Sequence, residues 1–65
     1  MSDEVDLEIQ EWIIRSWEDG WGEELRLTED VYGVLSIEGR FRGSAAELLR
    51  VLVEIIQEVM RHADL

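Results

Sequence analysis

Residues 44–62, SAAELLRVLVEIIQEVMRH, predict one long helix with a defined start. Ser44 and Glu47 have the spacing of a capping box, in which each side chain accepts a hydrogen bond from the other residue's backbone amide. At about 100° per residue, the apolar side chains cover roughly 220° of the helix, whereas a helix that packs on one side needs only about 100°. We therefore expect this helix to be contacted on two sides. The remaining narrow stripe is polar: Glu47, Arg50, Glu54, Gln57, Glu58 and Arg61.

The two segments before this helix have the pattern of a β-hairpin. In VLSIEGRFRG, every second residue from Leu35 to Phe41 is apolar or glycine, and this period of two is typical of a strand with one buried face. ELRLT predicts a shorter strand with Leu25 and Leu27 on its buried face. The link EDVYG supplies Asp and Gly for a turn, so residues 24–42 predict a hairpin whose turn type stays open.

The N-terminal segment allows two interpretations. Val5, Leu7 and Ile9 alternate as they would in a strand. Over a longer window a helix from Asp3 to Glu18 fits better, because the acids gather on one side and the apolar residues on the other. That apolar side would consist of Val5, Ile9, Trp12, Ile13 and Trp17. Gly20 is then expected to end the helix by adopting a positive φ.

These elements predict a single small acidic α+β domain over residues 1–65, in which a β-hairpin is flanked by an N-terminal and a C-terminal helix (α-β-β-α). A lone two-stranded hairpin is too small a sheet to be stable. Chains of this size usually need disulfides, a structural metal or association. The sequence has no cysteine and one histidine, His62, which excludes disulfides and argues against zinc. We therefore expect a homodimer.

The net charge of −10 is concentrated in the first half of the chain. Residues 1–30 hold eleven acids and two arginines, whereas residues 31–65 hold five acids and four arginines. This charge argues against direct binding to nucleic acids or anionic membranes and favours a basic protein partner, with a solvated surface as the alternative. MSDEVDLE lacks the features of a signal peptide, and no apolar run is long enough to cross a bilayer, so we expect a cytoplasmic protein.

Two of the three tryptophans lie in SWEDGWGEEL, residues 16–25, among glycines and acids. In a structural interpretation, Trp17 and Trp21 fold back over one end of the hairpin. In a functional interpretation, at least one of them anchors a partner, because tryptophan is enriched at interface hot spots. The acids around them would then form an acidic rim: Glu18, Asp19, Glu23 and Glu24.

A second candidate surface is the acidic side of the expected N-terminal helix. Glu4, Glu8 and Glu11 would lie about one turn apart, or about 5–6 Å. Carboxylates at such a spacing can imitate the regular negative charge of a nucleic-acid backbone. The alternative is an ordinary solvated helix face.

No pattern of residues predicts catalysis. The carboxylate pairs Glu23–Glu24 and Glu29–Asp30 do not fit the ligand spacing of a calcium-binding loop. His62 has no nucleophile near it in the sequence, and its place in the last helical turn suits the helix dipole. We therefore expect no enzyme activity, no metal and no cofactor.

LRLTEDVY followed by SAAELLR, within residues 25–50, resembles the strand and helix starts of ribbon-helix-helix DNA-binding proteins. The stretch between these segments departs from that family because it is short, contains Gly33 and Gly39, and has a period of two. The resemblance implies a self-associating homodimeric regulatory or structural module. The first hypothesis for function is instead an acidic inhibitor of a basic nucleic-acid-binding protein. Small phage-encoded antagonists, such as anti-CRISPR proteins, have a similar general appearance.

Overall fold

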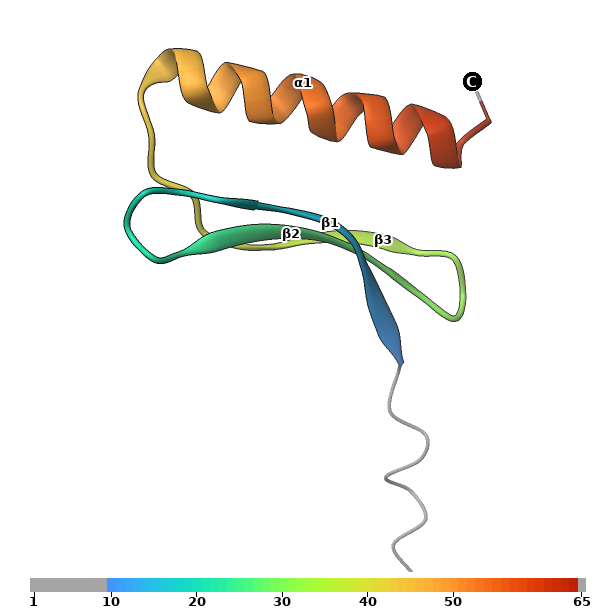
Figure 1. Ribbon diagram of the computed structural model, residues 1–65. Helices are drawn as coiled ribbons and strands as arrows, with labels where there is room; N and C mark the ends of the chain where they lie inside the picture. The colour runs from blue at the N-terminus through green and yellow to red at the C-terminus, as the bar shows by residue number, and fades with distance from the viewer. Residues whose placement is uncertain (1–9, 65) are drawn as a thin grey trace, which may run out of the picture.

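The computed structural model describes residues 10–64 and has three strands followed by one helix. The strands β1 (Glu11–Glu18), β2 (Glu24–Asp30) and β3 (Leu35–Gly39) form an antiparallel sheet in the order β1-β2-β3. The helix α1 (Ala45–His62) lies across one face of this sheet (Figure 1). The α+β class and the hairpin formed by β2 and β3 are confirmed.

The prediction of an N-terminal helix from Asp3 to Glu18 is wrong for the part of this range that forms a strand. Residues 11–18 form β1, which pairs along its length with β2. Residues 3–9, with the strand-like alternation found there, lie outside the described residues. The sheet therefore has three strands, and its first strand comes from a segment whose sequence favours a helix. The ribbon-helix-helix arrangement does not fit either, because β3 is a strand where that family has its first helix.

A β-bulge in β1 explains why the periodicity of this segment pointed to a helix. Ile13 lies opposite Thr28 and Arg15 lies opposite Leu27, so Ile14 is an extra residue without a partner in β2. The extra residue interrupts the alternation of buried and exposed positions, and the apolar residues on its two sides take a spacing closer to that of a helix. Pairing with β2 then decides the conformation, because strand formation depends more on neighbours than on the segment itself.

The turns at the two ends of β2 have the same construction. The amide of Asp19 donates to the carbonyl of Glu23 at 2.9 Å, and Asp30 makes the same hydrogen bond to the residue four positions on, at 3.1 Å. Gly22 and Gly33 close these loops with φ angles of 88° and 81°. Such a glycine is typical of three-residue hairpin loops that end in a bulge. The positive φ expected at Gly20 therefore occurs at Gly22 instead.

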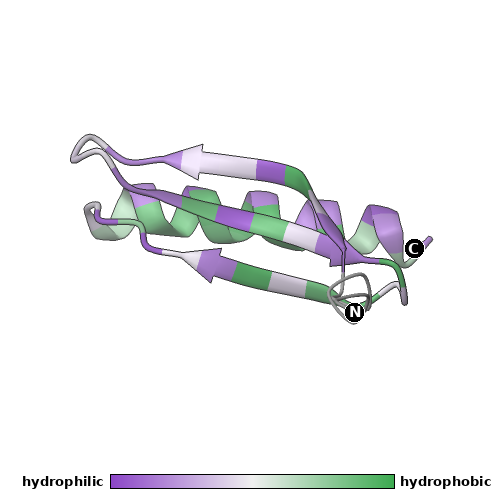
Figure 2. Ribbon diagram, turned by 90° about the horizontal axis from the view of Figure 1, so that it is seen from below, coloured by the Kyte–Doolittle hydropathy of each residue, from purple (hydrophilic) through white to green (hydrophobic). Residues whose placement is uncertain are grey.

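The core is small and lies between α1 and the sheet, and Leu35 of β3 packs against it. Its buried hydrophobic members are Trp17, Leu27, Val51 and Ile55. Figure 2 shows α1 behind the central strand β2, with β1 and β3 on either side of it. On the face of the sheet that α1 occupies, Leu27 in β2 is buried, whereas Ile37 in β3 is 54% exposed.

The start of α1 is the capping box that the sequence predicts. The Ser44 hydroxyl accepts a hydrogen bond from the Glu47 amide at 3.2 Å, and the Glu47 carboxylate accepts one from the Ser44 amide at 2.8 Å. The amphipathic pattern predicts the length of the helix correctly, but it does not determine how the helix is rotated about its axis against the sheet.

Candidate functional site

The turn between β1 and β2 is organised by the carboxylate of Asp19. Its Oδ1 accepts hydrogen bonds from the amides of Trp21 at 2.8 Å and Glu23 at 3.0 Å, and its Oδ2 accepts one from the amide of Arg42 at 2.9 Å. Desolvation acts to raise the pKa of Asp19, but these three hydrogen bonds and the charge of Arg42 outweigh it. The pKa of Asp19 therefore lies below its ordinary value of 3.8. The carboxylate of Asp19 is thus engaged with the backbone of its own chain.

The structure separates the two tryptophans of this segment. Trp17 is only 8% exposed and belongs to the core, and its indole Nε1 donates to Glu54 Oε1 at 2.8 Å. Trp21 does not fold back over the hairpin, because its side chain lies in the turn and is 70% exposed. Of the two, only Trp21 presents most of its surface to a possible partner.

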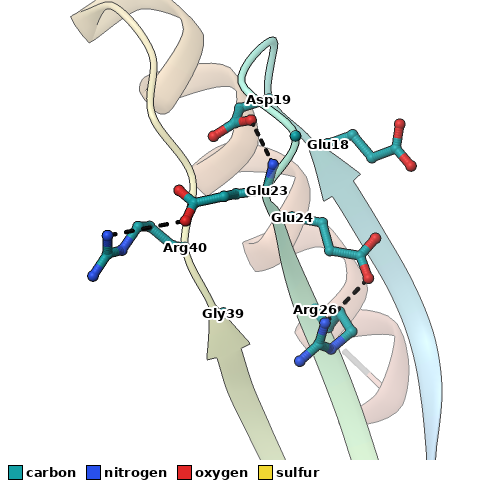
Figure 3. A pocket seen from close by; sticks show the side chains of 8 residues that line it. Glu18, Asp19, Glu23, Glu24, Arg26, Gly39 and Arg40 are labelled. Carbon is teal, nitrogen blue, oxygen red and sulfur yellow. Dashed lines mark hydrogen bonds and ion pairs between the residues drawn. The ribbon is translucent and has the colours of Figure 1, made fainter.

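The acids of the turn line an open hollow of about 760 Å³ at one end of the sheet (Figure 3). Two of these acids are paired with arginines. Glu23 Oε1 lies 3.2 Å from Arg42 Nε, and Glu24 Oε2 lies 3.1 Å from Arg26 Nη1. Glu18 makes no ion pair within residues 10–64. The hollow therefore mixes both signs of charge and is not a purely acidic rim. Its full lining is Glu18, Asp19, Gly22, Glu23, Glu24, Arg26, Gly39 and Arg40.

Contrary to the sequence prediction, Glu11 does not belong to a row of carboxylates along an N-terminal helix. It is the first residue of β1 and lies opposite Asp30. Glu4 and Glu8 lie outside the described residues. Acids gather instead on the outer face of the sheet, which we define as the face turned away from α1. Leu25 and Leu27 pack toward α1, so the residues that alternate with them in β2 point to the outer face. The residues of β1 and β3 that lie opposite these alternate residues belong to the outer face as well. The charged residues there include Glu11, Glu18, Glu24, Arg26 and Glu38.

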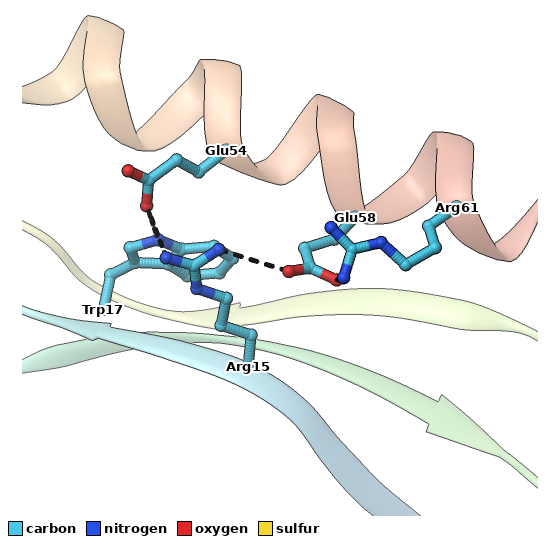
Figure 4. Close-up of polar contacts among 5 residues, drawn as sticks. All are labelled: Arg15, Trp17, Glu54, Glu58 and Arg61. Carbon is cyan, nitrogen blue, oxygen red and sulfur yellow. Dashed lines mark hydrogen bonds and ion pairs between the residues drawn. The ribbon is translucent and has the colours of Figure 1, made fainter.

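An ion-pair cluster joins β1 to α1 (Figure 4). Arg15 Nη2 lies 2.9 Å from Glu54 Oε1, and Arg15 Nη1 lies 3.2 Å from Glu58 Oε2. Arg61 reaches the other oxygen of Glu58 at 3.7 Å, and the Arg15 guanidinium lies 5.3 Å from the centre of the Trp17 ring. This cluster turns the polar stripe of α1 toward β1, so the helix is not oriented with all of its polar residues in water.

The rotation of α1 leaves much of its apolar surface uncovered. Val51 and Ile55 are buried against the sheet, but seven other large apolar residues are between 37% and 63% exposed. We call these seven the open helix face: Leu48, Leu49, Leu52, Val53, Ile56, Val59 and Met60. None of them is charged. The sequence predicts a second contact for this helix, and the described part of the chain supplies only the first.

No protein-family model matches the chain, and none of the curated proteins or solved structures matches it at a significant level. Over residues 10–64, no helix combines the length and the apolar character needed to cross a bilayer. In the same part of the chain, histidine and acidic side chains nowhere form a group of three that could hold a metal ion.

Proposed function

We propose that the protein is a non-enzymatic protein-binding module that associates as a homodimer through the open helix face. The observation that carries this proposal is the exposure of seven large apolar side chains on one helix. Together with Ile37 they expose on the order of 700 Å², more than the few hundred Å² of the apolar patches that monomers normally show. A standard interface buries about 800 Å² per partner, so this surface has the size of an interface.

A second copy of the chain suits this surface better than a basic protein does. Each chain carries a net charge of −10, and two such chains approach most easily through a surface that carries no charge. Within residues 10–64 only four hydrophobic residues are buried, which is little for a domain with no disulfide to stabilise it. Dimerisation would extend this core.

Light scattering or sedimentation at micromolar concentration tests the homodimer. We expect the wild-type chain to be a dimer and Ile56→Asp to be a monomer, because a charge placed within an apolar interface is left unpaired. Gln57→Asp is the matched control, since it adds the same charge at the next position of α1, on the polar stripe, and should leave the dimer intact. A wild-type chain that stays monomeric would refute the proposal.

A second candidate function is inhibition of a basic nucleic-acid-binding protein, in the manner of phage antagonists of the anti-CRISPR type. The exposure of Trp21 favours it, because this indole covers no core and belongs to the turn that joins Glu18 to Glu24. Trp21 would anchor the partner, while the carboxylates would accelerate encounter. The two functions are compatible, since they use different surfaces.

A pull-down from a lysate, with and without nuclease, tests this second function by looking for a basic protein partner. Trp21→Ala should then weaken binding by about 2 kcal/mol or more, the usual hot-spot threshold, with little change in melting temperature. Trp17→Ala should instead lower the stability by about 3–5 kcal/mol, as the loss of a buried large aromatic does. If Trp21→Ala melts as far below the wild type as Trp17→Ala, Trp21 is a structural residue and the anchor hypothesis fails.

A further inference from the structure

At the β3 edge of the sheet, Ile37 is an exposed apolar side chain on the same side of the sheet as α1. Ile37 in β3 lies directly opposite Leu27 in β2, so the two side chains share the face that α1 occupies. Leu27 lies on the central strand beneath α1 and is 1% exposed, whereas Ile37 lies on the edge strand and is 54% exposed (Figure 2). A homodimer that covered only the helix would leave Ile37 in water.

The open helix face points in two directions. Glu54 and Glu58 lie on the β1 side of α1, so the opposite flank of the helix is turned toward the space above β3. At about 100° per residue, that flank carries Leu48, Leu52 and Val59. The residues pointing away from the sheet are Leu49, Val53 and Met60, with Ile56 between the two directions.

We propose that in the homodimer the partner's α1 lies over β3, beside the first α1, so that each helix is enclosed between two sheets. This arrangement deepens the proposed self-association and depends on it. Packed helices lie about 8–10 Å apart, and neighbouring strands lie about 4.8 Å apart. A helix packed beside α1 therefore lies about two strand spacings from β2, at β3 and the free edge of the sheet beyond it.

The two-fold symmetry of such a dimer covers both directions of the open helix face. The flank of each α1 that faces β3 packs against the same flank of the partner's α1. The side of each α1 that points away from the sheet of its own chain packs against β3 of the partner. The layers are then sheet, helix pair and sheet. The acidic outer faces of the two sheets then lie on opposite sides of the assembly. This placement reduces the repulsion between two chains that each carry a net charge of −10.

Edge-to-edge pairing of two β3 strands is the main alternative, and it accounts for less of the surface. It would form a continuous six-stranded sheet with the two helices on one side. The helices would then lie about 14 Å apart, because three strand spacings of about 4.8 Å separate the two β2 strands beneath them. That distance exceeds the 8–10 Å of packed helices, so the open helix face would stay uncovered.

A pair of isoleucines provides a matched test. Ile37 and Ile13 both lie in edge strands and are 54% and 56% exposed, but Ile13 lies opposite Thr28 and therefore on the outer face. We expect Ile37→Asp to raise the dissociation constant of the dimer at least tenfold and Ile13→Asp to leave it unchanged. Thermal melts show whether each variant folds, and Ile37→Thr, which keeps a β-branched side chain, replaces Ile37→Asp if the latter does not.

Isotope-filtered NOEs in a mixed dimer of labelled and unlabelled chains locate the contact directly. The arrangement predicts NOEs between the Ile37 methyl groups of one chain and methyl groups of the other chain's α1. A wild-type dimer with intermolecular NOEs only between the helices, or between the two β3 strands, would overturn the arrangement while leaving self-association in place. A monomeric wild-type chain would overturn both.

Discussion

Asp19 and Asp30 perform the same task in the two turns. Oδ1 of Asp30 accepts hydrogen bonds from the amides two and four positions on, at 2.8 and 3.0 Å, as Oδ1 of Asp19 does in the first turn. Both turns share the sequence Asp, any residue, aromatic, Gly, and in both the aromatic residue is exposed: Trp21 is 70% and Tyr32 74% exposed. The exposure of Trp21 therefore follows from the construction of the turn. The shared pattern was visible in the sequence and separates Trp21 from Trp17.

The glycines of the first turn should differ in their tolerance of a side chain. Gly22 has a φ of 88°, whereas the φ of Gly20 is not positive. A Cβ atom at either position would meet open space, so the difference lies in the backbone alone. Gly22→Ala should lower the free energy of unfolding by about 1–2 kcal/mol, the cost of a left-handed residue with a Cβ atom. Gly20→Ala should lower it little or not at all, and urea unfolding of the two variants measures the difference.

The stability contributed by Asp19 should depend on pH. Because the pKa of Asp19 is lowered in the folded chain, its ionised form stabilises the fold at a pH above the ordinary value of 3.8, and this contribution is lost as the pH falls through the folded pKa. Asp19→Asn should therefore be less stable than the wild type at neutral pH. Urea unfolding of both proteins, from neutral pH to below that pKa, measures the difference between their free energies of unfolding. This difference should become smaller as the pH falls. A difference that stays constant over this range would contradict this role of the carboxylate.

The contact between β1 and α1 combines buried charge with hydrophobic packing. Glu58 is 8% exposed, so its carboxylate relies on Arg15 and on the more distant Arg61. Arg15→Met should lower the stability by about 1–3 kcal/mol, because a charged group with little access to water loses its closer partner. The double variant Arg15→Met, Glu58→Leu should recover much of this loss, since apolar residues often replace a buried ion pair without cost.

Chemical denaturation of both variants measures these effects. Arg40→Ala is the control, because Arg40 is 69% exposed at its side chain and its ion pair with Glu23 spans 3.9 Å. Its effect should stay within about 0.5 kcal/mol, as is usual for surface substitutions. If the double variant is no more stable than Arg15→Met alone, an unpaired Glu58 is not the cause of the loss.

The elements that depend on local signals were predictable, and those that depend on distant pairing were not. The capping box at Ser44 and the alternation from Leu35 to Phe41 each lie within one segment, so α1 and β3 follow from the sequence. The bulge at Ile14 conceals the alternation of β1, and only the partner strand restores it. The rotation of α1 depends on pairing between Arg15 and Glu58, which lie 43 positions apart. A polar stripe on a helix ordinarily predicts a solvated face, and here part of it faces β1.

At the scale of the whole molecule, the two proposed functions use surfaces of opposite character. The open helix face carries no charge, whereas Trp21 lies in the turn between β1 and β2, with acidic residues on both sides of it in the sequence. Salt screens the exposed charges, with a Debye length of about 10 Å at 0.1 M and about 3 Å at 1 M. Binding to a basic partner should therefore weaken as salt is added, because the attraction between opposite charges is screened.

Self-association should respond to salt in the opposite direction. Two chains of −10 repel one another, and their proposed contact contains no ion pair that salt could weaken. Raising NaCl from about 0.05 M to about 0.5 M should lower the dissociation constant of the dimer at least tenfold, or by about 1.4 kcal/mol. Sedimentation equilibrium across this range measures the constant, and the melting temperature should rise with protein concentration at each salt level. Ile56→Asp should remain monomeric throughout. A dissociation constant that increases with salt would mean that charged contacts hold the dimer together, and the open helix face would not be its interface.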